Sequence, residues 1–112
     1  MDTDYGLNFE GDDIHSVILA PWIYCHDMVL EGEMEDIIRN ISYTLQSNPE
    51  HCDRLLTQRL IFDKKKTDDV VHYWKSEERD GTRKNIVSTF VTTESGLTRV
   101  FPLRYFFNYI AS

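Results

Sequence analysis

The chain has 112 residues, of which 41% are hydrophobic and 28% are charged, and its formal net charge is -7. This length and composition suit one small globular domain, or part of one, and exclude a disordered tail. The acidic balance is a poor electrostatic match to phosphate backbones and anionic lipid, so we expect no nucleic acid partner. No stretch approaches the ~18 apolar residues of a membrane-spanning helix, so we expect no direct membrane span.

The first part of the chain is predicted to be a polar lead-in followed by a short strand. Residues 1–14 are mostly polar and acidic. Met1 to Asp4 carries acids where a secretory signal would be basic, so we expect no signal peptide. The apolar run from Ser16 to Ala20 ends at Pro21, which favours a strand.

A first helix is predicted over residues 33–46. Its apolar residues recur at helical spacing on one stripe, namely Met34, Ile37, Ile38, Ile41 and Leu45. Acidic residues occupy the first turn, where they complement the positive end of the helix dipole. The pair Asn48-Pro49 is expected to end the helix.

Two further helices are predicted, separated by a lysine run. The first covers residues 52–62, with Leu55, Leu56 and Leu60 facing inward. Lys64–Lys66 is expected to interrupt it as a solvated loop, after which Thr67 caps a short third helix. Residues 76–84 then form a polar connection.

The end of the chain changes from helical to strand-like periodicity. Residues 85–92 are rich in β-branched residues, which favours a strand. Residues 93–96 form a turn in which Gly96 is free to take positive φ, and residues 97–101 return as a second strand. The predicted fold class is α+β, with N-terminal helices followed by a β-hairpin.

No spacing of reactive residues predicts an enzyme, a metal site or a cofactor. The four histidines form no zinc-binding pair; they are His15, His26, His51 and His72. Asp12-Asp13 and Asp68-Asp69 lack the spacing of a calcium loop. The serines and cysteines lie in no nucleophile signature, and no glycine loop could hold a phosphate. We therefore expect no catalytic residue, no bound metal and no cofactor.

Two cysteines and one sequon have meanings that depend on the compartment. Cys25 and Cys52 lack C-x-x-C spacing, so counting alone leaves a disulfide and two buried free thiols as equal alternatives. Asn40-Ile41-Ser42 is an N-glycosylation sequon, and Asn40 lies away from the apolar stripe of its helix.

Four separate blocks of the chain share their order and spacing with one known family. They are Ile18–Asp27, which contains Ala-Pro followed by Tyr-Cys; Cys52–Asp63, which contains Leu-Leu; Thr67–Trp74, which ends in Tyr-Trp; and Phe90–Pro102. Together they resemble the alpha-2/delta auxiliary subunits of voltage-gated calcium channels. Agreement of four blocks is far more specific than any one of them.

The resemblance implies a domain organisation and two modified sites. It implies a partial Cache (PAS-like) domain over residues 15–102, between the lead-in 1–14 and a divergent aromatic C-terminal tail over 103–112. It implies a disulfide between Cys25 and Cys52, and glycosylation at Asn40 if the chain enters the secretory pathway.

The same resemblance implies a function. It indicates a non-catalytic segment of a longer protein on the extracellular side of the plasma membrane. Its partner would be the pore-forming subunit of a voltage-gated calcium channel, whose surface expression and gating it would support. The alternative is a small-molecule-sensing Cache module binding an amino-acid-like ligand, for which Arg99 is the only arginine well placed on a strand. A third is a free-standing cytosolic α+β protein.

A partial Cache sheet has a consequence for solution behaviour. A lone two-stranded hairpin is marginal, and its second strand, residues 97–101, is expected to expose an unpaired edge. We therefore expect the chain, as a truncated piece, to self-associate.

Overall fold

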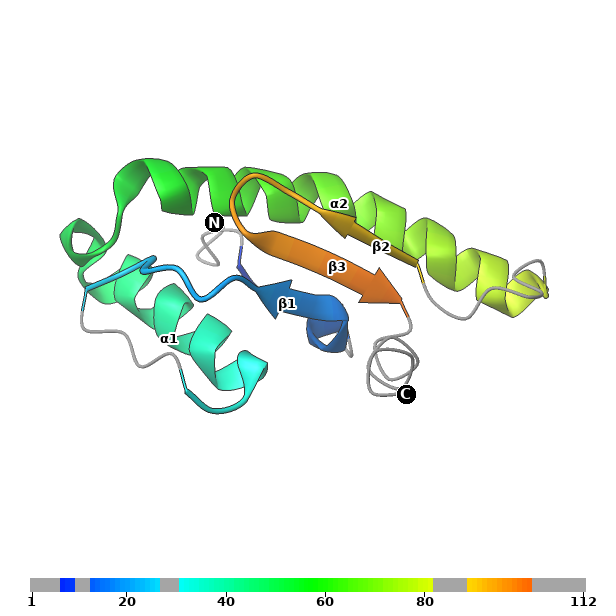
Figure 1. Ribbon diagram of the computed structural model, residues 1–112, viewed down its shortest axis with the longest axis horizontal. Helices are drawn as coiled ribbons and strands as arrows, with labels where there is room; N and C mark the ends of the chain where they lie inside the picture. Colours follow the sequence, from blue (N-terminus) through cyan, green and yellow to red (C-terminus); the bar gives the residue numbers. More distant parts are fainter. Residues whose placement is uncertain (1–6, 10–12, 27–30, 82–88, 102–112) are drawn as a thin grey trace.

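The computed structural model describes residues 7–9, 13–26, 31–81 and 89–101. Strands β1 (Val17–Leu19), β2 (Thr89–Thr92) and β3 (Leu97–Phe101) form one antiparallel sheet in the order β1-β3-β2. Figure 1 shows the long helix α2 running along this sheet, while α1 lies on the side of β1. A 3-10 turn, η1 (Asp13–Ser16), leads into β1.

The centre of the sheet is β3. Leu97 pairs with Leu19 of β1, and Val100 pairs with Phe90 of β2, so β3 has a neighbour on each side. The expectation of an unpaired edge on residues 97–101 is therefore wrong, because the strand predicted between Ser16 and Ala20 occupies that edge. Among the described residues, β1 and β2 are the outer strands of the sheet.

Helix α1 (Met34–Ser47) confirms the first predicted helix. Four apolar residues of its stripe are buried, and Met34 packs partly against them; the four are Ile37, Ile38, Ile41 and Leu45. The backbone N–H of Asn48 donates to the Thr44 carbonyl at 2.8 Å, after which Pro49 begins a short 3-10 turn, η2 (Pro49–His51). The apolar period therefore decided both the length and the buried side of this helix.

Helix α2 (Arg54–Asp80) is one continuous helix of 27 residues, so the predicted interruption at Lys64–Lys66 is wrong. Lysine is a good helix former, and Lys64 forms an ion pair with Asp68 one turn later at 2.8 Å. Thr67 does not cap a helix, because its hydroxyl donates to the Asp63 carbonyl at 2.7 Å. Gly81, with φ of 73°, ends the helix within the predicted polar connection.

The true cap of α2 is Asp53, whose carboxylate accepts from the Leu56 N–H at 3.0 Å. From this start, Leu60, Val71 and Trp74 face the interior. Leu55 was expected to face inward, but its side chain points to solvent and is 79% exposed. Five positions separate Leu55 from the buried Leu60, and at ~100° per residue they turn the Leu55 side chain roughly 140° away from the buried face.

An apolar core among the described residues joins the sheet to both helices. Its most deeply buried apolar members are Val17, Tyr24, Ile41, Leu60 and Leu97. Leu7, from the predicted lead-in, also packs in this core. The predicted strand residues 85–88 and the predicted tail 103–112 lie outside the described residues.

Candidate functional site

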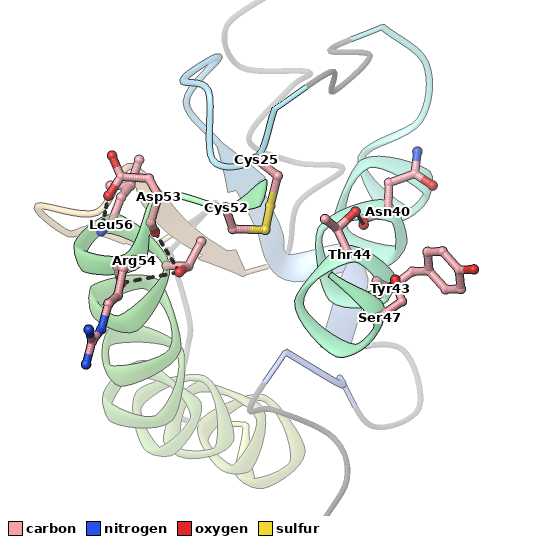
Figure 2. The surroundings of a disulfide bond; sticks show 10 residues. Cys25, Asn40, Tyr43, Thr44, Ser47, Cys52, Asp53, Arg54 and Leu56 are labelled. Carbon is pink, nitrogen blue, oxygen red and sulfur yellow. Dashed lines mark hydrogen bonds between the residues drawn. A yellow bond between two sulfur atoms is a disulfide. The ribbon is translucent and has the colours of Figure 1, made fainter. Parts of the chain in front are cut away.

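The two cysteines meet where the chain leaving β1 passes the start of α2. The structure joins Cys25 and Cys52 in a disulfide, with their Cα atoms 3.8 Å apart (Figure 2). They face each other across an isolated antiparallel bridge. Backbone hydrogen bonds flank the pair: the Asp53 N–H donates to the Tyr24 carbonyl at 2.8 Å, and the His26 N–H donates to the His51 carbonyl at 2.6 Å. This is the non-hydrogen-bonded pair of an antiparallel ladder, where side chains approach most closely.

The disulfide closes a loop that contains all of α1. Both cysteines are buried, so the sulfur atoms lie away from solvent reductants. The next residue after Cys52 is Asp53, the cap of α2, and its carbonyl accepts a hydrogen bond from the Thr57 hydroxyl at 2.7 Å. The cross-link therefore fixes the N-terminus of α2 against the end of the β1 segment.

Asn40 lies on the solvent side of α1. Its side chain is exposed, whereas the next residue, Ile41, is fully buried. Its backbone carbonyl accepts a hydrogen bond from the Thr44 hydroxyl at 2.9 Å, within the helix. Figure 2 shows the amide projecting outward from α1 and away from the disulfide. A glycan on this amide would not meet the core.

Tyr24, beside the disulfide, holds the β2–β3 turn. Its hydroxyl donates to the Ser95 carbonyl at 2.6 Å, and burial raises the pKa of Tyr24 to about 12. Gly96, with φ of 85°, lies so close that an added Cβ would be 2.5 Å from the tyrosine oxygen and 2.9 Å from the Trp22 ring. Only glycine satisfies both the backbone angle and this approach.

The other end of the sheet holds the buried arginine that the sequence offered for the alternative function, a Cache module binding an amino-acid-like ligand. Arg99 is 0% exposed. Its guanidinium donates to the Asp68 carboxylate at 2.9 Å, to the Thr67 hydroxyl at 3.0 Å and to the Ser16 hydroxyl at 3.1 Å. The Phe9 ring lies 5.2 Å from its central carbon. This cluster, which we call the Arg99 cluster, connects η1, α2 and β3.

A second ion pair extends the Arg99 cluster along α2. The Asp13 carboxylate in η1 is buried and pairs with Lys75, while His72 lies 3.4 Å from its other oxygen. Burying a charge is costly unless it is paired and hydrogen-bonded, which both carboxylates here achieve. The cluster therefore acts as a polar clamp between the lead into β1 and the second half of α2.

The Arg99 guanidinium is enclosed by its own chain. One terminal nitrogen, Nη2, has no hydrogen-bond partner within the described residues, but it is buried. A cavity in the apolar core, lined by Phe9 and Lys64 among others but not by Arg99, has a volume of about 10 Å³, which leaves no room for an amino-acid-sized ligand. Two surface grooves of about 450 and 420 Å³ lie beside α1, and Arg99 lines neither.

The described ranges, 7–9, 13–26, 31–81 and 89–101, contain no group of three or more His, Cys, Asp or Glu side chains that could hold a metal ion. His26 and His51 come close, with ring centroids 6.1 Å apart, while His15 and His72 lie elsewhere. Within the same ranges no helix is both long and apolar enough to cross a membrane. What the described residues do provide is a disulfide between Cys25 and Cys52 and two surface grooves beside α1.

Comparison with known proteins gives one family. A sequence profile described as neuronal voltage-dependent calcium channel alpha 2acd matches residues 7–111. The voltage-dependent calcium channel subunit alpha-2/delta-2 of Homo sapiens is 27% identical over 90 residues, which are 77% of this chain and 8% of that relative. The same subunits of Mus musculus and Rattus norvegicus match with equal identity and coverage. The chain thus spans 8% of the length of the curated relatives it matches.

Proposed function

Because this chain belongs to the alpha-2/delta family of voltage-dependent calcium channel subunits, we propose that it is an extracellular, non-catalytic segment of such a subunit. In this role it supports surface expression and gating of the pore-forming subunit through protein contacts. The observation that carries the proposal is the family match, which extends over residues 7–111.

The buried disulfide supports the extracellular assignment. Disulfides persist in oxidising compartments and are rare in the cytosol, where thiols are kept reduced. The Cys25–Cys52 bridge joins two segments that also pair through backbone hydrogen bonds, so it belongs to the folded core. A cytosolic copy of this chain would lose the bridge and with it a constraint on the start of α2.

Two finer proposals accompany this function. We propose that Asn40 carries an N-linked glycan, since its amide projects into solvent from α1. We also propose that the three-stranded sheet with its two helices is part of a Cache (PAS-like) domain, in which further strands would pair with the open edges of β1 or β2. A longer structure in which both edges stay unpaired would contradict the second proposal.

The test of the main proposal uses the chain in a secreting cell. The chain, preceded by a cleavable secretion signal, is expressed together with the pore-forming subunit of a voltage-gated calcium channel. We expect the two to co-purify from surface-labelled membranes, with an increased calcium current. An Asn40→Gln variant should lose the mass shift that glycosidase produces in the wild type.

A chimera provides the decisive control. The segment of alpha-2/delta-2 that matches this chain is replaced by the chain itself, or by its Cys25→Ser/Cys52→Ser variant. We expect the first chimera to support channel current and the second to do so less well. If neither the free chain nor the first chimera co-purifies with the pore subunit, the proposed function is wrong.

A further inference from the structure

A regular stripe of exposed residues follows the solvent side of α2. Its spacing is four, three, four, three and four residues; the members are Leu55, Arg59, Phe62, Lys66, Asp69 and Tyr73. Their apolar members are unusually open, with exposed fractions of 79% for Leu55, 49% for Phe62 and 62% for Tyr73. A 3.5-residue repeat is the spacing at which one side of a helix faces a coiled-coil partner. We call these six residues the α2 stripe.

The α2 stripe is separate from the side of the helix that builds the core. Leu60, Val71 and Trp74 are buried and face the protein interior. At ~100° per residue the six stripe residues fall within one arc of roughly 80°, centred about 135° around the helix axis from these core residues. A single helix of 27 residues thus carries two organised faces, of which only one is used within the described residues.

The α2 stripe is complementary to itself when reversed. Each member has a mate at the same distance on the other side of residue 64. Leu55 mirrors Tyr73, Arg59 mirrors Asp69, and Phe62 mirrors Lys66. Two copies of α2 packed antiparallel around a twofold axis at residue 64 would form three kinds of contact: apolar with aromatic, arginine with aspartate, and aromatic with ammonium.

The side chains are already disposed for these contacts. The Phe62 ring lies 5.6 Å from the Arg59 guanidinium carbon and 5.4 Å from the Lys66 ammonium, so it already serves as a surface for cations. Arg59 pairs with the strongly exposed Glu94 at 3.0 Å, a weak surface contact, and its Nε lies 3.5 Å from Asp63 of its own helix. Asp69 is exposed and makes no ion pair with any described residue.

We propose that the α2 stripe is a dimerisation surface on which two copies of this chain pair through antiparallel α2 helices. The charged residues of the stripe favour an antiparallel over a parallel orientation of the two helices. A parallel pair would align Arg59, Lys66 and Asp69 each with its own copy, which makes three repulsive layers. The antiparallel pair converts them into two ion pairs and two cation–aromatic contacts. This inference concerns the free chain and does not depend on the proposed channel function.

The dimer is expected to be weak and tunable. The stripe covers about 28 Å of helix, at ~1.5 Å per residue, and includes polar layers, so it resembles a small transient interface. Lys65 lies next to the twofold axis and would face its own copy. Removing that charge should therefore tighten the dimer, an effect that non-specific association through apolar side chains does not predict.

The test is sedimentation of the full chain between about 10 and 500 µM. We expect reversible monomer–dimer behaviour for the wild type. Arg59→Asp alone places two aspartates opposite each other in each arginine–aspartate layer, and Asp69→Arg alone places two arginines opposite each other there. Each should weaken the dimer about tenfold or more, because like charges facing each other are strongly unfavourable. A mixture of the two variants should form a heterodimer with both layers complementary again.

The controls separate this surface from others. Lys65→Gln should tighten the dimer, and Tyr43→Ala, which removes an exposed aromatic residue from α1, should leave it unchanged. Circular dichroism shows that each variant is folded, and rescue on mixing requires folded partners. The proposal is wrong if the wild type stays monomeric over the whole range, if the charge variants dimerise as tightly as the wild type, or if mixing restores nothing.

Discussion

The two ends of the sheet hold α2 by different means. At one end, the Cys25–Cys52 disulfide and the Tyr24–Ser95 hydrogen bond fix the start of α2 and the β2–β3 turn. At the other end, the Arg99 cluster attaches the middle of α2 through charge and hydroxyl groups. A disulfide stabilises the fold mainly by restricting the unfolded chain. A buried ion pair stabilises it only if both charged groups keep their hydrogen-bond partners in the folded chain. The two ends should therefore fail under different conditions.

The largest effect is expected from Arg99→Ala. The change removes the hydrogen bonds of the buried guanidinium to Ser16, Thr67 and Asp68, leaves Asp68 with Lys64 as its ion-pair partner, and opens a cavity between η1, α2 and β3. We expect a loss of about 3–5 kcal/mol in the free energy of unfolding, measured by denaturant titration. Arg39→Ala, at an exposed arginine of α1 that pairs with Glu35 on the surface, should cost less than about 1 kcal/mol. Equal losses of unfolding free energy for the two variants would show that the Arg99 cluster stabilises the fold no more than a surface ion pair does.

The disulfide end is tested by Cys25→Ser/Cys52→Ser. The closed loop has a sequence separation of 27, so the chain-entropy relation predicts a loss of roughly 3–4 kcal/mol. Thermal unfolding with and without reductant checks this. Reductant should lower the midpoint of the wild type and leave the variant unchanged. A wild type insensitive to reductant after unfolding and refolding would contradict the prediction.

Gly96→Ala should show how tightly the turn is held at the disulfide end. The new methyl group would lie 2.5 Å from the Tyr24 hydroxyl oxygen, and φ at this position is 85°. We expect a loss of about 2–3 kcal/mol, of which ~1 comes from the backbone angle. Gly81→Ala is the matched control, because φ there is 73° and nothing lies within 4 Å. If both variants lose the same stability, the close approach to Tyr24 is unimportant.

The smallest effect is a dependence on pH that belongs to the disulfide end alone. Burial raises the pKa of Tyr24 to about 12 from 10.0. A raised pKa means that the native hydrogen bond is fully present below pH 10 and is lost as pH rises through 12. Tyr24→Phe should cost about 1 kcal/mol at neutral pH, and its difference from the wild type should shrink over that alkaline range. Tyr43→Phe, at an exposed tyrosine, should follow the wild type throughout.

The sequence pattern correctly predicted those elements whose structure is decided by residues close together along the chain. The apolar stripe of α1 and the turn at Gly96 are of this kind, and both are confirmed. Local pattern failed at Lys64–Lys66, where charge suggested a loop although lysine favours a helix and Lys64 finds Asp68 one turn away. It also failed for the edge of β3, because pairing with β1 joins residues at opposite ends of the sequence.

In the candidate site, too, the features set by nearby residues were predicted and those set by distant residues were not. Sequence placed Asn40 off the apolar stripe, and the structure exposes it. The resemblance supplied the pairing of the cysteines, which counting left open. The Arg99 cluster had no sequence signature, since Ser16, Thr67 and Asp68 come from two distant segments. The register between β1 and β3 brings Ser16 beside Arg99, whereas Thr67 and Asp68 meet it only through the packing of α2 on the sheet.

The strand order also sets a sequence of events during synthesis. Ser16 and Arg99 are 83 positions apart, so the first strand must wait until the last one leaves the ribosome before it can pair. Cys25 and Cys52 are separated by 27 positions and emerge together much earlier. Contacts between distant residues form slowly, because a long loop must close first. In an oxidising compartment the cross-link can therefore form before the sheet does, which shortens the loop that must close when β1 pairs with β3.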